Sequence, residues 1–263
     1  MEDGEEITYG LEHIDRYEFR HFEICANMWY LPHKRKRIYF VGVLKEFCKP
    51  GTMDGIAATI KECCHKRKGH IDDCLYDVRT EHVKDVEQGS SAKRPRTTRC
   101  NFQIFDEVRE KEGFQHRDSR CGQPFSRKLG KTKCQELGMR NCEILDITML
   151  RELKQHGCMR PRVLVDLSQN IKRRVTTANG DMGTPTTSQM LFDMDAKKFL
   201  QCEDIFQAMG WPAQLLEVSA LSKSQWQRLT GNMMVLPCVG VCMAAILKHV
   251  VFHSDTNFSR AKK

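Results

Sequence analysis

The spacing of apolar residues predicts a chain of mixed helices and strands. Residues 38–43 form an apolar run with no polar side, which is typical of a strand buried on both faces of a parallel-rich α/β sheet. A second apolar run, residues 163–167, predicts another strand. It follows residues 141–155, where apolar positions recur at the spacing of an amphipathic helix, and residues 56–64 show a shorter helical pattern. The predicted fold class is therefore α/β.

The last apolar segment predicts a helix that begins near Pro237. Proline fits the first turn of a helix, and residues 239–251 are apolar enough to be buried, so Cys238 is expected to be a core thiol. Gly231 and Asn232 precede this helix, and we expect them close to its positive amino terminus, where a carboxylate binds favourably. A plain helix cap followed by a core helix explains the same residues and stays open as an alternative.

Length and composition suggest two units within the 263 residues, a lobe of strand and helix built from both ends of the chain and an inserted middle. The longest apolar run, residues 235–247, contains a proline and is too short to span a membrane. The acidic amino terminus does not resemble a secretory leader. We therefore expect an intracellular protein with no membrane partner, nuclear if the source is eukaryotic and otherwise cytoplasmic.

Positive charge favours a nucleic-acid partner. The net charge is +8, and clusters of lysine and arginine recur through the middle of the chain. Each cluster alone could be a solvated surface, but as a set they favour a groove that follows phosphates, with binding that weakens in salt. The tetrad at residues 93–96 can also be read as a nuclear import signal, within a polar tract at 89–98 that predicts a loop. The clusters occupy residues 33–37, 66–68, 93–99, 127–133, 160–162 and 172–174.

Thirteen cysteines in an intracellular chain are expected to be reduced thiols, and their odd number means that they cannot all pair internally. One group has metal-ligand character, Cys63, Cys64 and His65 with His70 and Cys74. Its adjacent cysteines and irregular gaps fit zinc poorly. We expect no metal site.

Residues 33–37 read His-Lys-Arg-Lys-Arg, directly after Pro32 and directly before the apolar strand. In extended backbone, side chains two residues apart share a face, so Arg35 and Arg37 are predicted to project together at the mouth of the strand. Paired guanidinium groups can grip a phosphate or a base edge. A solvated basic turn before an ordinary strand is the plainer alternative.

This segment resembles the eighth conserved block of the DNA cytosine-5 methyltransferases, in which a proline precedes Gln-x-Arg-x-Arg and an apolar strand ending in glycine. Asn27 matches an asparagine that precedes the block, and His33 stands where the family usually has glutamine. Residues 163–212 are similar to the ninth-block region, although the ending Met-Gly-Trp-Pro replaces Gln-Gly-Phe-Pro and the usual Arg-x-Leu-Thr opening is not clear. Residues 229–239 resemble the tenth block, in which Gly-Asn leads to a proline and a long apolar helix. The three occur in the family's order.

Three other blocks of the family do not appear in the sequence: the acidic-Phe-x-Gly-x-Gly cofactor block, the Pro-Cys block that bears the nucleophile, and the Glu-Asn-Val block. The one Pro-Cys dipeptide, Pro237-Cys238, lies inside the tenth block. The chain begins about where the sixth block would have ended. The resemblance therefore implies the carboxyl-terminal half of a methyltransferase, with no catalytic nucleophile of its own.

The resemblance also implies roles for individual residues. Arg37 would contact a cytosine flipped out of the duplex, Arg35 would support that base or a nearby phosphate, and His33 would replace glutamine as a hydrogen-bond partner. One wall of a partial S-adenosylmethionine site would comprise Gly231, Asn232 and Met233. The implied regions are the end of a mixed-sheet catalytic lobe at 1–48, an irregular target-recognition region at 49–160, and the ninth and tenth blocks at 161–263.

The leading hypothesis is S-adenosylmethionine-dependent methylation of cytosine in double-stranded DNA by a chain that is incomplete and inactive alone. A second polypeptide that contains the missing blocks would complete it. Without the rest of the sheet, apolar surface at 38–43 and 244–251 would stay uncovered. The alternative is a non-catalytic DNA-binding module or an inactive relative of the enzymes.

Overall fold

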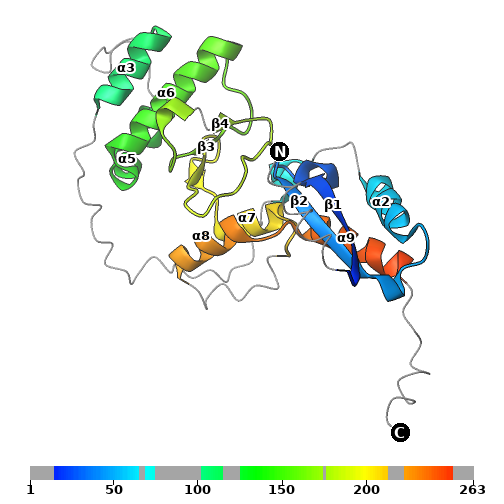
Figure 1. Ribbon diagram of the computed structural model, residues 1–263. Helices are drawn as coiled ribbons and strands as arrows, with labels where there is room; N and C mark the ends of the chain where they lie inside the picture. Colours follow the sequence, from blue (N-terminus) through cyan, green and yellow to red (C-terminus); the bar gives the residue numbers. More distant parts are fainter. Residues whose placement is uncertain are drawn as a thin grey trace. The chain divides into compact units, whose positions relative to one another are not determined.

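The computed structural model describes two compact units of mixed helix and strand (Figure 1). Unit 1 comprises Met1–Gly69, Met209–Trp211 and Met233–Lys263, and unit 2 comprises His70–Ala208 and Pro212–Asn232. Unit 1 is thus drawn from both ends of the sequence. The residues described are 15–64, 69–74, 102–114, 125–173, 176–212 and 222–250.

Unit 1 is built on a β-hairpin. Strands β1 (Tyr17–Cys25) and β2 (Lys36–Leu44) pair antiparallel, with Ile24 opposite Arg37 and Tyr17 opposite Leu44. The 3₁₀ turn η1 (Ala26–Trp29) leads out of β1, and η2 (Lys45–Phe47) follows β2. Within the described residues, each strand pairs only with the other.

The prediction of a parallel strand buried on both faces is wrong in this structure. The pairing is antiparallel, and only the face of β2 that bears Val41 and Val43 is buried. The other face is apolar as well, but Ile38 is 40% exposed, Phe40 is half-buried, and Phe19 of β1 lies over Gly42. The sequence pattern correctly indicates two apolar faces of β2. In the described part of unit 1, other elements cover only the face that bears Val41 and Val43.

Two helices cover the buried face of the hairpin. Helix α2 (Thr52–Cys63) and helix α9 (Leu236–His249) pack on each other and on the strands. Gly55 allows their close approach, because a Cβ there would lie 2.6 Å from Nδ1 of His249, and His249 Nε2 is 2.8 Å from the Thr59 hydroxyl. Both helices were predicted and are confirmed, with α2 beginning four residues earlier and Pro237 in the first turn of α9.

Unit 2 combines helices with a small antiparallel sheet whose strand order is β4-β3-β5-β6. The predicted strand at 163–167 is confirmed as the shorter β3, and the predicted helix at 141–155 as α6. The strands are β3 (Leu164–Asp166), β4 (Thr176–Thr177), β5 (Leu191–Asp193) and β6 (Lys198–Phe199). The helices are α3 (Gln103–Glu112), α4 (Phe125–Leu129), α5 (Lys131–Leu137), α6 (Met139–His156), α7 (Cys202–Ala208) and α8 (Lys223–Asn232), with 3₁₀ turns η3 (Ile71–Cys74) and η4 (Ile171–Arg173).

Helix α6 is the centre of unit 2. The sequence indicates one apolar face, but every side chain from 142 to 149 is buried, because α3, α4, α5 and the sheet surround the helix. The charges of α6 are therefore buried as ion pairs: Arg109 of α3 with Glu143 at 3.0 Å, and Arg151 with Glu112 at 2.6 Å. Buried charges need such partners because desolvation is costly.

Several sequence predictions fall outside the described residues, namely the loop at 89–98 with its basic tetrad and the clusters at 66–68 and 93–99. No single helix in the described ranges is long and apolar enough to cross a membrane. By length and composition, α8 and α9 could do so only if they formed one broken span together.

Candidate nucleic-acid interface

The loop that precedes β2 is held in place by backbone contacts. The Ala26 amide donates to the Arg35 carbonyl at 3.2 Å, which ties the end of β1 to the start of β2. Tyr30 takes the left-handed conformation at φ 59°, and its carbonyl lies against Gly69. A Cβ at residue 69 would be 1.7 Å from that oxygen, so only glycine allows this approach. Residues 33–37 therefore follow a tied loop.

The basic residues of this loop alternate between buried and exposed positions. His33 is fully buried and Arg35 is 6% exposed, whereas Lys34, Lys36 and Arg37 are exposed. A solvated turn would expose all five, so the plainer alternative from sequence does not describe this segment. His33 is a core residue of unit 1.

Arg37 begins the row of side chains on the inner face of β2. The register places it opposite Ile24, so it shares a face with Tyr39, Val41 and Val43 but lies beyond the end of the core. Its Nη1 donates to the Lys36 carbonyl at 2.8 Å. Lys36 lies on the other face, where it forms an ion pair with Glu23. The guanidinium of Arg37 is exposed to solvent and available to a partner.

Electrostatics tie Arg35, Arg37 and Tyr39 into one group. Burial lowers the pKa of Arg35, the positive charge of Arg37 lowers it further, and Tyr39 raises it. Two positive groups near each other at the edge of a low-dielectric core favour an anion. The group can therefore bind a phosphate or a polarised base edge. Tyr39 was not among the residues predicted from sequence, although the same two-residue alternation that linked the arginines would have found it.

Cys238 is confirmed as a core thiol. It is fully buried in α9 and shares a hydrogen bond with Tyr39. Burial raises its pKa to about 12, and Cys242 one turn further along α9 also raises it. Because the thiolate is the nucleophilic form of cysteine, Cys238 is a poor nucleophile at neutral pH.

Gly231 and Asn232 lie at the end of a helix, whereas the sequence placed them just before the start of the helix that contains Pro237. They are the last two residues of α8, and α9 begins with Val235 as its amino-terminal cap. Near its start, α8 packs on α7, with the Trp226 and Phe206 ring centroids 5.0 Å apart. The end of a helix has negative partial charge, so the backbone of α8 does not favour a carboxylate there. The exposed Asn232 side chain remains open to a ligand.

Segments that resemble the ninth and tenth blocks meet in each unit. In unit 2, Gly231 lies so close to the loop at 186–187 that a Cβ would be 2.2 Å from the Thr187 amide nitrogen. In unit 1, the Leu236 amide donates to the Met209 carbonyl at 3.1 Å, and the Trp211 indole donates to the Met234 carbonyl at 2.8 Å. Met233 is half-buried against the core of unit 1.

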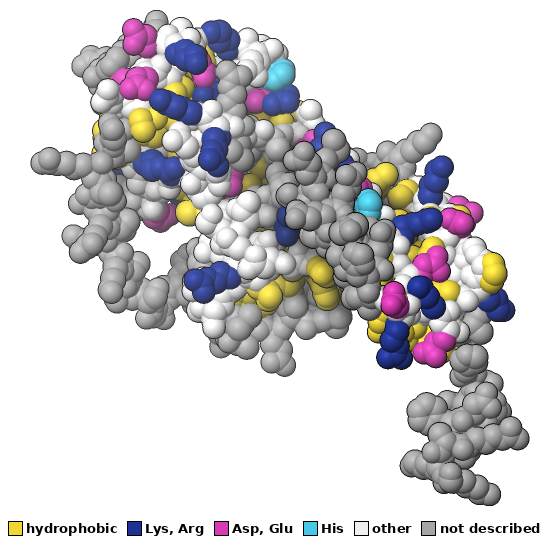
Figure 2. Space-filling model, viewed as in Figure 1, with side chains coloured by type: hydrophobic (Ala, Val, Ile, Leu, Met, Phe, Trp, Pro, Cys, Tyr) yellow, Lys and Arg dark blue, Asp and Glu magenta, His cyan; other side chains and the backbone are white. Residues whose placement is uncertain are grey.

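Several basic residues of unit 2 have structural roles. Arg160 pairs with Glu152 at 2.7 Å, Arg162 with Asp193 at 2.7 Å, and Lys172 with Glu107 at 3.0 Å. These positions were counted from sequence as phosphate-contact clusters, but each has a carboxylate partner. Figure 2 shows lysine and arginine side chains spread over the visible part of unit 2 with carboxylates among them. Within the described residues, Arg127, Lys128 and Lys131 form no ion pair.

A comparison with protein-family models and with curated proteins found no match to this sequence. Among the described side chains, no group of three or more histidine, cysteine or acidic residues could hold a metal ion. Of the suggested metal ligands, His65 lies outside the described residues, and Cys63 and Cys64 belong to unit 1 whereas His70 and Cys74 belong to unit 2.

Proposed function

We propose that this chain is the DNA-binding, carboxyl-terminal part of an S-adenosylmethionine-dependent DNA cytosine-5 methyltransferase. It would be active only together with the part of the enzyme that bears the nucleophile. The observation that carries the proposal is the hairpin of unit 1, which contains Arg35 and Arg37; among the described residues no third strand pairs with either edge, and Ile38 on its second apolar face is 40% exposed. A strand pair of this kind fits the edge of a larger α/β sheet.

Helix α9 exposes a separate apolar surface, on the side of the helix that faces away from the hairpin. Cys238, Val241, Cys242 and Ala245 face the core, and the opposite face exposes Met243 at 55% and Leu247 at 61%. Apolar side chains four residues apart form a stripe on one helix face. The occupant we propose is the missing sheet lobe, because the described part of the unit has strand edges without a paired strand and exposed apolar side chains for packing.

The arginine pair would act on DNA by binding. Arg37 would form the direct contact with the flipped cytosine or its phosphate, since its exposed guanidinium has a planar, forked set of donors. Arg35 would hold positive charge behind it from within the protein. Met233 and the exposed Asn232 would belong to the cofactor wall, with Gly231 setting the close approach of α8 to the loop at 186–187.

Methyl transfer itself requires groups that we assign to the other part of the enzyme. A thiolate must add to the cytosine C6, an acid must stabilise the adduct near N3, and the methyl donor must be held in line. Cys238 cannot serve, because burial opposes its thiolate form. In this proposal, residues 1–48 end the catalytic lobe, residues 49–160 form the target-recognition region, and residues 161–263 contain the ninth and tenth blocks.

The decisive experiment measures transfer of tritiated methyl groups to duplex DNA that contains cytosine. The chain is assayed alone and mixed with a polypeptide that supplies the cofactor, Pro-Cys and Glu-Asn-Val blocks. We expect incorporation only in the mixture. No incorporation in the mixture, with DNA binding intact, would reject the enzyme hypothesis.

Substitutions then test the assigned residues in the active mixture. We expect Arg37→Ala to lower kcat/KM by about tenfold to a hundredfold, the range for loss of one bidentate base contact, and Arg37→Lys to recover only part of it. Lys45→Ala is the matched control, since Lys45 is an exposed cation at the other end of the same hairpin. Asn232→Ala should raise KM for S-adenosylmethionine. Unchanged values would remove these residues from the site.

A second candidate function is DNA binding without methyl transfer. It is favoured by Arg127, Lys128 and Lys131 of α4 and α5, which form no ion pair within the described residues. Their substitution by alanine should weaken duplex binding and reduce its dependence on salt. Under this function, S-adenosylmethionine changes neither the affinity nor the products.

A further inference from the structure

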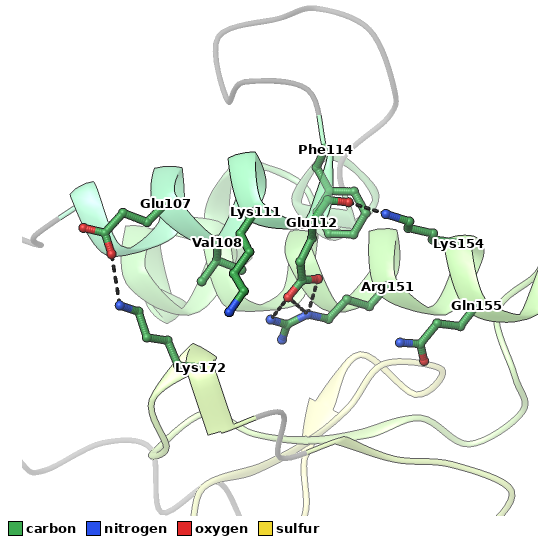
Figure 3. A pocket seen from close by; sticks show the side chains of 9 residues that line it. All are labelled: Glu107, Val108, Lys111, Glu112, Phe114, Arg151, Lys154, Gln155 and Lys172. Atoms are coloured by element: carbon green, nitrogen blue, oxygen red, sulfur yellow. Dashed lines mark hydrogen bonds and ion pairs between the residues drawn. The ribbon is translucent and has the colours of Figure 1, made fainter.

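Unit 2 contains a cavity of about 600 Å³ on the side of α6 that faces α3 (Figure 3). Its walls come from α3, from the residues just after α3, from the last turns of α6 and from η4. A cavity of this volume is in the range of small-molecule sites and far exceeds the space of one water molecule.

The carboxylates of the cavity are already neutralised. Glu112 accepts from the buried Arg151 at 2.9 Å (Nε) and 2.6 Å (Nη2), and Arg151 Nη1 donates to the Ile171 carbonyl at 3.1 Å. Glu107 pairs with Lys172 at 3.0 Å. These two pairs fix the walls and leave no negative charge in excess.

Two further lysines give the cavity an excess of positive charge. Lys154 lies 5.4 Å from the centroid of the Phe114 ring and donates to the backbone carbonyl of Glu112 at the end of α3. Lys111 has no hydrogen bond or ion pair with any described residue, and neither has Gln155. Figure 3 shows the Lys111 amine on one side of the Arg151 guanidinium and the Gln155 amide on the other side, next to the Arg151 side chain.

From this arrangement we propose that the cavity binds a phosphate group with an attached organic part. The phosphate oxygens accept hydrogen bonds from Lys111 and Gln155, next to the fixed positive charge of Arg151. Val108 and Phe114 supply the apolar wall for the remainder of the ligand. The source of the phosphate is either a free nucleotide or a nucleic-acid backbone. The proposal stands apart from methyl transfer, since none of the predicted substrate-binding or cofactor-binding residues lines the cavity.

The test is isothermal titration of the full chain with adenosine 5′-monophosphate, inorganic phosphate and adenosine. We expect saturable binding of the monophosphate, weaker binding of phosphate and none of adenosine. Lys111→Met should lower the affinity for the monophosphate by at least about tenfold, as expected for a lost charged hydrogen bond. Gln155→Leu should lower that affinity by a smaller factor. Lys111→Arg should restore most of the affinity.

Lys198→Met is the matched control, because Lys198 is an exposed cation on β6 of the same unit and does not line the cavity. Absence of saturable monophosphate binding, or equal affinity in Lys111→Met and wild type, would overturn the proposal. Competition between a short duplex DNA and the monophosphate would identify a backbone phosphate as the source, and lack of competition a free nucleotide. Because the readout is binding, failure of methyl transfer leaves this test intact.

Discussion

The two units of this protein differ in where their charged and apolar side chains lie. In unit 2, arginines such as Arg109, Arg151 and Arg160 each have a carboxylate partner, and the apolar core surrounds α6. In unit 1, Arg35 is 6% exposed and Arg37 is exposed, and the described residues leave apolar side chains such as Ile38 of the hairpin and Leu247 of α9 exposed. Unit 2 thus pairs several buried charges around α6, whereas unit 1 exposes apolar side chains at the faces where we propose that a second polypeptide binds.

The largest expected effect is a difference in labelling rate between a core thiol of unit 1 and the exposed thiols of both units. Cys238 has a pKa of about 12 against an ordinary 9.0, so we expect iodoacetamide at pH 8 to modify it about a thousandfold more slowly than the exposed Cys63 or Cys158. Peptide mass spectrometry after timed labelling measures this. All three thiols should react alike in concentrated urea, and rapid native labelling of Cys238 would show that the core of unit 1 is open.

Removing one partner of a buried ion pair should destabilise unit 2 strongly. We expect Arg109→Ala to lower the free energy of unfolding by about 3–5 kcal/mol, because Glu143 is left charged and buried. Urea unfolding followed by circular dichroism measures the loss. The exposed Lys172–Glu107 pair is the control, and Lys172→Ala should cost less than about 1 kcal/mol. Equal costs would mean that burial does not distinguish the pairs.

The pair between Glu152 and Arg160 should make the stability of unit 2 depend on acid. The hydrogen bond that the Glu152 carboxylate accepts from Arg160 holds the pKa of Glu152 below the usual 4.5. The ionised carboxylate therefore stabilises the fold at neutral pH. Protonation removes that stabilisation as the pH falls through the lowered pKa. Glu152→Gln should cost about 1–3 kcal/mol at pH 7. The cost should shrink as the pH falls below 4.5. A difference that stays constant with pH would assign the loss to packing.

The smallest effect on stability is expected on the exposed face of α9. Leu247→Lys should change the free energy of unfolding by less than about 0.5 kcal/mol, because the side chain is largely exposed. The same substitution should reduce self-association and lower methyl transfer in the reconstituted mixture, since it places a charge on the proposed docking face. Leu153→Lys on α6 of unit 2 is the control and should leave the mixture active. Equal effects of the two would remove the contrast between the units.

Local pattern was enough to predict the helices α2, α6 and α9 and the strand β3, because apolar spacing and Pro237 act within a few residues. The alternation of Arg35 and Arg37 likewise follows from backbone geometry. Pattern did not reveal β1, whose mixed polar and apolar residues gain their order from pairing with β2. Nor did pattern reveal α8, whose last residues are Gly231 and Asn232 and which packs on α7 through Trp226.

The sequence by itself determined the extended segments β2 and β3, the helices α2, α6 and α9, and that positive charge gathers before β2. Those properties are local, because they follow from side-chain periodicity and backbone preference. Only the tertiary structure decided that His33 and Arg35 are buried while Arg37 is exposed, that Arg160 and Arg162 have acidic partners, and that Lys111 faces a cavity. Burial and charge pairing depend on which distant segments meet, and chain order alone does not specify those contacts.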